Sequence, residues 1–233
     1  MDMDPLRISV IIPAFNEESV IEATLQQFQQ GVEPFEIIVV DGGSDDRTVS
    51  LVASVERVRL VSGRHRGRAA QMNEGASIAT GDVLLFLHAD TRLPGLWCDR
   101  IVDSIEHHKA IGGRFRIGID DSKAIYRWIA FGSNFRSRVL GVTYGDQAIY
   151  ARTDVFSRIG GYPALPLFED SGLADLLKKE GLFDWIDLPV LTSSRRWRKG
   201  GPLRTVAKMW LMRVGYSLGI GPSALRRFYD HAR

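Results

Sequence analysis

The chain has little of what marks several protein classes. It holds one cysteine, Cys98, in 233 residues, so no disulfide can form within it, which fits a reducing compartment. Its apolar runs, such as Ile8–Ile12, fall far short of the roughly 20 residues of a membrane-spanning helix. The first residues also lack the basic segment and the long apolar stretch of a signal peptide. We therefore expect a cytoplasmic protein.

The net charge is small but unevenly distributed. A formal charge of +2 argues against nucleic acid as a partner of the whole chain. From Thr192 to Arg233, however, ten Lys or Arg stand against one acidic residue, Asp230, so this segment carries +9 and the remainder −7. Such a basic tail predicts contact with something anionic. A peripheral position at the inner face of the membrane is therefore the alternative to a purely cytoplasmic one.

Short apolar runs alternate with helical patterns in the first half of the chain. Their lengths and periods predict strands at Ile8–Ile12, Phe35–Val40, Val58–Val61 and Val83–Leu87, and helices at Glu17–Gln30, Arg47–Val55, Arg68–Ala79 and Pro94–Lys109. Continuous apolar strands separated by helices are typical of an α/β fold. We expect a mostly parallel central sheet with helices on both faces.

The second half is less regular. It predicts strands at Gly112–Ile119 and Gln147–Ala151, and helices at Lys123–Arg138, Phe168–Lys179, Thr205–Leu218 and Pro222–Arg233. In the Lys123–Arg138 helix we expect Ile125, Trp128, Ile129 and Phe131 to point inward. No repeat or linker divides the chain. The predicted organisation is one domain over residues 1–200, with a basic helical extension over 201–233 packed on it.

Three predicted strands end in polar loops, and ligands of such sheets bind at the carboxyl ends of strands. After the first strand, Pro13 is expected to turn the chain out of the sheet, and Asn16 to cap the next helix. After the second, Asp41 stands at the strand tip before two glycines, where it could accept hydrogen bonds from a base or a ribose.

The third loop is His88-Ala89-Asp90-Thr91. Mg²⁺ and Mn²⁺ prefer oxygen ligands and often bind one or two carboxylates together with phosphate oxygens, so Asp90 could hold a cation that bridges a diphosphate. A single Asp after a strand is more often a cap or part of a turn. The metal interpretation depends on three polar loops meeting at one sheet edge.

Further polar residues lie outside these loops, each with a plain structural alternative. Arg64, Arg66 and Arg68 suit phosphate, or form a solvated basic loop. Glu169 and Asp170 precede a helix, and could supply the general base that sugar transfer needs or cap that helix. Arg196 could stabilise a diphosphate leaving group, or belong with Trp197 to a basic surface segment.

Four segments, SVIIPAFNEE, EIIVVDGGSDDRT, GRAAQMNEGASIATGDVLLFLHADT and IGGYP…FEDSGL, follow one another along the chain. In this order they resemble glycosyltransferase family 2, the inverting enzymes with the GT-A fold. The resemblance implies transfer from a nucleotide-diphosphate sugar, most naturally a UDP- or GDP-sugar, with a divalent metal, Mg or Mn. The HADT segment is similar to a bacterial subgroup associated with radical-SAM, selenodomain or arsenosugar gene sets.

The resemblance also implies roles for individual residues. Those that would surround the nucleotide and its sugar are Pro13, Phe15, Glu17, Asp41, Arg68 and Asn73. Asp90 would hold the metal, Asp170 would be the base with Glu169 beside it, and Arg196 and Trp197 resemble an Arg-Trp pair of a later family motif. His88 replaces an Asp that commonly faces the ribose. It would bond ribose or phosphate instead, and the lost charge would weaken cation binding.

Two other functions compete with sugar transfer. A nucleotidyltransferase that makes nucleotide sugars would carry a Gly-rich basic loop after the first strand, where this chain has Pro-Ala-Phe-Asn-Glu. A non-catalytic nucleotide-sugar binding protein would not need both Asp90 and Asp170. A dinucleotide oxidoreductase is disfavoured because no G-x-G-x-x-G follows the first strand.

The basic tail adds one more expectation. Arg204, Lys208 and Arg213, interleaved with Trp210, Leu211 and Tyr216, predict an amphipathic helix. Such a helix could rest on anionic lipid, in which case the unknown acceptor would be lipid-linked. The alternative is a helix packed on the catalytic domain with its charges in water.

Overall fold

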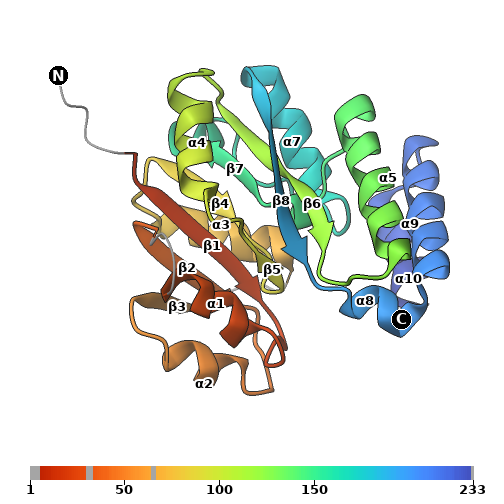
Figure 1. Ribbon diagram of the computed structural model, residues 1–233, viewed down its shortest axis with the longest axis horizontal. Helices are drawn as coiled ribbons and strands as arrows, with labels where there is room; N and C mark the ends of the chain where they lie inside the picture. Colours follow the sequence, from red (N-terminus) through yellow and green to blue (C-terminus); the bar gives the residue numbers. More distant parts are fainter. Residues whose placement is uncertain (1–5, 30–33, 64–66, 232–233) are drawn as a thin grey trace.

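The computed structural model describes residues 6–29, 34–63 and 67–231, and within them eight strands form one sheet (Figure 1). Their order across the sheet is β3-β2-β1-β4-β7-β6-β8-β5. Four parallel strands make up one half: β1 (Ile8–Ala14), β2 (Glu36–Asp41), β3 (Val58–Ser62) and β4 (Val83–Phe86). The other half is mixed: β5 (Thr91–Arg92), β6 (Gly112–Ile119), β7 (Ile149–Arg152) and β8 (Phe183–Thr192).

Helices cover both faces of this sheet, because its central strands are apolar on both sides. Against one face lie α1 (Ile21–Gln29), α2 (Thr48–Ala53) and α4 (Trp97–Glu106), which share a core with Val10 and Ile12 of β1. Against the other lie α3 (Arg68–Ile78), α6 (Thr153–Arg158) and α7 (Glu169–Glu180), which pack on Ile11. The predicted α/β architecture is confirmed, and its sheet is mixed because β7 and β5 run against the rest.

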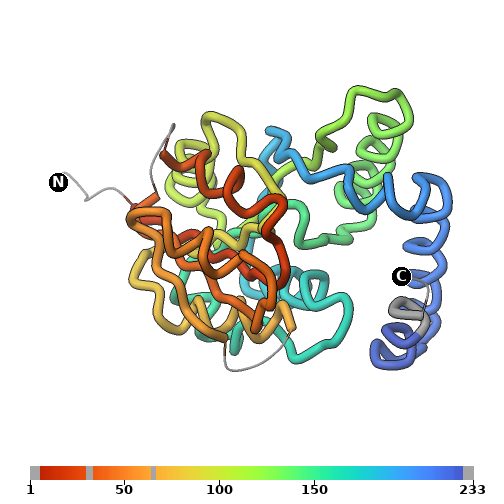
Figure 2. The backbone as a smooth tube through the Cα atoms, turned by 90° about the horizontal axis from the view of Figure 1, so that it is seen from below, coloured from red at the N-terminus to blue at the C-terminus, as the bar shows by residue number. Residues whose placement is uncertain are grey.

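The remaining helices gather at one end of the sheet, beyond β6 and β8 (Figures 1 and 2). They are α5 (Ala124–Leu140), α8 (Arg195–Gly200), α9 (Pro202–Ser217) and α10 (Pro222–His231), with a single 3-10 turn, η1 (Gly145–Gln147), beneath them. Among the helices of the described residues, none has the length and apolarity needed to cross a bilayer.

The expectation about Pro13 was wrong. Pro13 does not turn the chain out of the sheet: β1 continues to Ala14, and Pro13 pairs in register with Val40. The Ile11 carbonyl accepts a hydrogen bond from Leu87 on the β4 side, and Pro13, two residues on, faces that side after β4 has ended. Its missing N–H therefore leaves no ladder bond unmade.

The inward face of α5 is only partly the one that we expected. Trp128 and Phe131 are 70% and 63% exposed, whereas Ile125 and Ile129 are half-buried.

The helix packs on β6 through polar groups. The Asn134 side chain donates to the Ile117 carbonyl and accepts from its N–H, both at 2.9 Å. Buried Arg114 donates to the Ser137 hydroxyl and carbonyl at 2.8 Å. These bonds satisfy the polar groups that the packing of α5 on β6 covers.

The sequence did not predict β8, which carries three polar or proline interruptions, Asp184, Asp187 and Pro189. It pairs with β6 along its whole length through a register shift. Such a strand has no continuous apolar signal and no strict alternation, so its pairing partner determines it.

One buried side chain fastens α3 to the sheet edge at which the polar loops begin. Gln71 of α3 is 3% exposed, and its amide nitrogen donates to the Ala14 and Val40 carbonyls, each at 2.8 Å. These carbonyls stand at the ends of β1 and β2. Gln71 therefore ties the first turns of α3 to the tips of both strands.

We expect Gln71→Leu to lower the free energy of unfolding by about 2 kcal/mol, since the buried site loses both hydrogen bonds that the Gln71 side chain donates. Chemical denaturation measures this. Gln26→Leu, at an exposed position of α1, is the matched control and should change stability by less than about 0.5 kcal/mol. Equal effects of the two substitutions would show that Gln71 does not hold the strand tips.

Candidate functional site

A large cavity of about 1230 Å³ lies beside the carboxyl ends of the parallel strands. Its walls come from the start of α3, the loop after β4, η1, the start of α7, α8 and the C-terminal helices. Eight of the predicted site residues line it: Arg68, Asn73, His88, Asp90, Glu169, Asp170, Arg196 and Trp197. Segments far apart in the sequence thus meet at one site. Of the three predicted strand-tip loops, the loop after β4 contributes to it, and the loops after β1 and β2 do not.

Four predicted residues, Pro13, Phe15, Glu17 and Asp41, do not line this cavity. They stand at the tips of β1 and β2, where Pro13 and Asp41 are buried and Phe15 is 47% exposed. The predicted Arg64 and Arg66 lie outside the described residues.

Hydrogen bonds within its own loop occupy the Asp41 carboxylate. It accepts from the Gly43 and Ser44 amides at 2.9 and 3.0 Å, and from the Ser44 hydroxyl at 2.5 Å. Each carboxylate oxygen can accept more than one bond, so the group still has capacity for a ligand. The first role of Asp41 is nevertheless to shape the Gly-rich turn.

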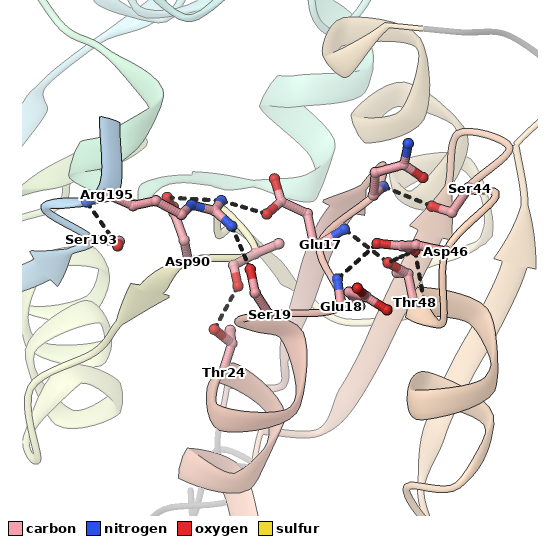
Figure 3. A network of polar contacts seen from close by, with 12 residues as sticks. Glu17, Glu18, Ser19, Thr24, Ser44, Asp46, Thr48, Asp90, Ser193 and Arg195 are labelled. Carbon is pink, nitrogen blue, oxygen red and sulfur yellow. Dashed lines mark hydrogen bonds and ion pairs between the residues drawn. The ribbon is translucent and has the colours of Figure 1, made fainter. Parts of the chain in front are cut away.

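The loops after β1 and β2 hold each other in place (Figure 3). The Asn16 backbone N–H donates to the Ser44 hydroxyl at 2.9 Å, and the Asn16 side-chain oxygen accepts from the Asp45 backbone N–H at 3.0 Å. The expectation that Asn16 caps the following helix was wrong, because α1 begins only at Ile21. Its left-handed backbone, with φ of 55°, is one that Asn tolerates better than most residues.

An ion-paired arginine joins the first and third loops (Figure 3). Arg195, at the start of α8, contacts Glu17 at 2.6 Å, donates to the Ser19 hydroxyl at 2.7 Å and approaches Asp90 at 3.9 Å. The sequence pointed to its neighbour, Arg196, which instead lines the cavity. The two arginines therefore point to different parts of the site.

The backbone around Asp90 is fixed on both sides. The Thr24 hydroxyl of α1 donates to the Ala89 carbonyl at 2.6 Å (Figure 3), and the Ser193 amide donates to the Asp90 carbonyl at 3.2 Å. The short strand β5 then pairs with the end of β8. These contacts present the Asp90 carboxylate at the cavity while its main chain stays rigid.

The residues present fit a divalent cation only in part. No group of three or more acidic, histidine or cysteine side chains gathers around one point among the described residues. The Asp90 carboxylate holds one long ion pair, to Arg195, which leaves its oxygens accessible for a cation. Mg²⁺ and Mn²⁺ bound by one or two carboxylates complete their shells with phosphate oxygens and water. The donor set thus fits a cation that arrives with a diphosphate.

Three more carboxylates crowd into the cavity: Asp146 of η1, and Glu169 and Asp170 in the first turn of α7. Asp170 is 5% exposed, and burial together with the Glu169 charge raises its pKa to about 7. Burial also raises the pKa of Asp146, while the charges of Arg196 and Arg136 oppose the rise. Asp170 is thus poised to exchange a proton near neutral pH.

His88 lies beside Asp170 with Gly145 between them. A Cβ at Gly145 would overlap the His88 Nε2 and would come within 2.5 Å of the Asp170 carboxylate, so only glycine fits there. Burial, and next the positive charges of Arg68 and Arg196, lower the pKa of His88 well below its usual value. The imidazole is therefore neutral at physiological pH. Its buried Nε2 has no hydrogen-bond partner among the described residues.

Asn73 lines the cavity but its amide is already engaged. Its nitrogen donates to the Tyr162 carbonyl at 2.9 Å, and its oxygen accepts from the Tyr162 amide at 2.8 Å. This pair ties α3 to the loop before α7. Tyr162 in turn packs below Asp170, where burial and the Asp170 charge raise the pKa of its hydroxyl well above the ordinary range.

Sequence reasoning missed three polar residues of this region: Arg136, Asp146 and Arg195. Arg136 sits in a helix whose face was assigned wrongly. Asp146 lies alone between two irregular segments, with no motif to mark it. The local signal available was a glycine next to an acidic residue shortly before a strand, in the segment Tyr144-Gly145-Asp146-Gln147.

Comparisons with known proteins agree with this geometry. The family model described as "Glycosyl transferase family 2" matches residues 9–158. Curated relatives include undecaprenyl-phosphate 4-deoxy-4-formamido-L-arabinose transferases. The protein of Pectobacterium carotovorum is 32% identical over 129 residues, covering 51% of this chain and 39% of that protein. The protein of Pseudomonas aeruginosa is 31% identical, with coverage of 52% and 38%. The chain thus spans about two fifths of these relatives' length.

Solved structures share the fold at low sequence identity. S. aureus TarS 1-349 in complex with UDP-GlcNAc superposes with a TM-score of 0.67 and 17% identity, covering 81% of this chain and 58% of that one. The mannosyltransferase PcManGT from Pyrobaculum calidifontis, in complex with GDP-Man and Mn²⁺, gives 0.58 and 21%, covering 89% and 66%. The sheet is therefore of the GT-A type. Since the family match covers more than half of the sequence, the chain belongs to glycosyl transferase family 2.

Proposed function

We propose that this protein is a glycosyltransferase that moves a sugar from a nucleotide-diphosphate sugar to an acceptor hydroxyl. The observation that carries the proposal is the meeting of Asp90, Asp170 and Arg196 in one cavity at the carboxyl ends of the strands. Such a transfer needs three groups: a carboxylate near the diphosphate, a buried base, and a positively charged side chain that stabilises the leaving group.

The donor is proposed to bind with its nucleotide at the tips of β1 and β2. Phe15 is exposed there and offers a ring to a base, and Asp41 closes the adjacent turn. The TarS and PcManGT structures contain UDP-GlcNAc and GDP-Man, which supports a UDP- or GDP-sugar as the donor class. Arg68 and Arg196, which line the cavity, would then face the diphosphate and sugar.

Asp90 is the residue that would hold a divalent metal, Mg or Mn. Such an ion would neutralise the negative charge that collects on the diphosphate as it leaves. The Mn²⁺ in the PcManGT complex supports this part of the proposal. His88 stands in place of an Asp of the family's metal motif and brings a neutral imidazole nitrogen to the site. Because the chain has His-Ala-Asp-Thr at this position, we propose that it belongs to the subgroup that carries this segment.

The reaction is proposed to be a single displacement. Asp170 accepts the proton of the acceptor hydroxyl, whose oxygen attacks the anomeric carbon from the face opposite the diphosphate. The carbon–oxygen bond to the diphosphate breaks, and the diphosphate leaves with the electron pair. Arg196 opposes the growing charge. One displacement and no covalent intermediate would invert the anomeric configuration, and a retained configuration in the product would overturn this step.

The acceptor is proposed to be lipid-linked, with the protein peripheral at the inner face of the membrane. The names of the curated relatives contain undecaprenyl-phosphate, which supports a lipid carrier. Leu211 of α9 and Leu218, directly after this helix, are 73% and 79% exposed, and Arg204 of α9 is exposed as well. Arg213 and Tyr216 instead turn onto Phe168, so only part of the predicted amphipathic face remains outward.

We expect wild-type protein to float with vesicles that contain anionic lipid, because exposed apolar groups and basic charge both favour that surface. Leu211→Glu and Leu218→Glu together should reduce the bound fraction severalfold, whereas a charge placed at exposed Val49 of α2 should not. Flotation of none of the protein, at low and at physiological salt, would refute the membrane contact.

Thermal denaturation with UDP, GDP, dTDP and CDP, each with and without Mn²⁺, tests the donor site. We expect one nucleotide to raise the melting temperature by about 5–10 °C at a hundredfold excess over its Kd, and only with the metal. Asp90→Asn should abolish the part of the melting-temperature shift that depends on the metal. Asp187→Asn, which changes a 70% exposed carboxylate, is the control and should retain the metal-dependent shift. No shift with any nucleotide would contradict a working donor site.

The transfer rate should depend on the ionisation of Asp170. With a pKa of about 7, its base form is lost as the pH falls, so the rate should rise about tenfold per pH unit below 7 and level off above it. Asp170→Asn should lower the rate by about 10²–10⁴ without weakening donor binding. Asp175→Asn, at a 66% exposed site of the same helix, should be neutral.

The same raised pKa predicts a trend in stability. Between the ordinary value of 3.8 and about 7, the folded protein binds a proton at Asp170 that the unfolded chain does not, so stability falls as pH rises through this window. Asp170→Asn should therefore become more stable relative to wild type as the pH increases. A pH-independent difference would show that Asp170 titrates normally.

A further inference from the structure

A second, narrower cavity of about 220 Å³ lies between α5 and α9, next to the reaction cavity. Both spaces are lined by Tyr144, Asp146, Trp197 and Met209. We call this second space the α5–α9 groove. Because these four residues line both spaces, a head group at the inner end of the groove lies beside the reaction cavity.

The walls of the groove are apolar. On α5 they are Ile125, Trp128, Ile129 and Gly132, whose spacing of three and four residues places them on one helical face. On α9 they are Leu203, Val206, Met209 and Trp210. Trp128 and Leu203 are about 70% exposed, so this lining is continuous with the outer surface. Such a lining favours an apolar chain over a polar sugar.

The inner end of the groove holds a buried cation. Arg136 is 8% exposed, and its guanidinium lies 4.7 Å from the centre of the Tyr144 ring and 5.7 Å from that of Trp210. Its Nε is buried without a hydrogen-bond partner among the described residues. A buried donor without a partner is costly, and an anionic ligand group would satisfy it.

We propose that the α5–α9 groove binds the apolar chain of an amphiphilic acceptor whose phosphate head lies at Arg136, beside the reaction cavity. This inference rests on the proposed function, since it gives the groove to the acceptor of that reaction. It names the chemical class of that acceptor: an isoprenoid-like or alkyl phosphate that bears the accepting hydroxyl beyond its phosphate. The exposed ring of Trp128 suits the boundary between an apolar chain and water.

The probes are isopentenyl, geranyl and farnesyl monophosphate, with farnesol as the uncharged counterpart, titrated calorimetrically below their micelle concentrations. A buried methylene contributes about fourfold in affinity, which is about 0.8 kcal/mol. The groove therefore predicts that Kd falls at least tenfold from isopentenyl to farnesyl phosphate. The Arg136 subsite predicts that farnesol binds at least tenfold more weakly than farnesyl phosphate.

Gly132→Leu is the blocking variant. A Cβ at Gly132 meets no atom within 4 Å, so the new side chain can enter the groove without disturbing the fold, and the helix gains a better helix former. Val206→Phe blocks from the α9 wall. Ala124→Leu adds the same side chain at an exposed position of α5 outside the groove and serves as the control.

We expect Gly132→Leu and Val206→Phe to remove most of the gain with chain length, and Ala124→Leu to retain it. Nucleotide-dependent thermal shifts should be unchanged in all three variants. An affinity that does not depend on chain length, or that depends on it equally in blocked and control variants, overturns the groove. If no nucleotide binds wild type but the chain-length dependence persists, the proposed function fails and the groove stands.

Discussion

The site depends on a balance of buried charge. Asp146, Glu169 and Asp170 line one cavity, where Glu169 and Asp170 are buried and Asp146 is half-buried, and their mutual repulsion would oppose folding if all were ionised and alone. Arg68 lies 3.8 Å from Glu169, and the charges of Arg196 and Arg136 act on Asp146. The arginines offset part of the repulsion. Burial, and next the Glu169 charge, still raise the pKa of Asp170 to about 7. This balance leaves Asp170 able to take up or release a proton near neutral pH.

The fold is organised so that distant segments contribute to this balance. Arg195 from the chain's last quarter bridges Glu17 after β1 and Asp90 after β4, while Gln71 ties α3 to the tips of β1 and β2. The helices at the sheet's end then close the cavity and leave the α5–α9 groove beside it. The polar strand-tip loops, the α7 carboxylates and the groove therefore lie toward one edge of the sheet in this member of glycosyl transferase family 2.

Local patterns predicted the parallel half of the fold well. Strands such as Ile8–Ala14 are apolar on both faces, and this signal does not depend on any partner. The strand-tip rule led to Asp90, which lines the cavity, and also to Glu17 and Asp41, which do not. Tertiary contacts decided the rest. The face of α5 follows from Asn134 and Arg114, which satisfy buried polar groups, and neither hydrophobic periodicity nor a motif reveals those pairings.

Burial among like charges should bring the pKa of Asp170 close to neutral pH, and the carboxyl resonance of Asp170 reports this pKa directly. The measurement is a ¹³C NMR titration of the aspartate side chains, with Asp170→Asn used to assign the resonance. The account predicts a midpoint near 7 for Asp170, well above the ordinary 3.8. A midpoint at or below the ordinary value would contradict this, because the surroundings would then favour the charged form of the carboxylate instead of disfavouring it.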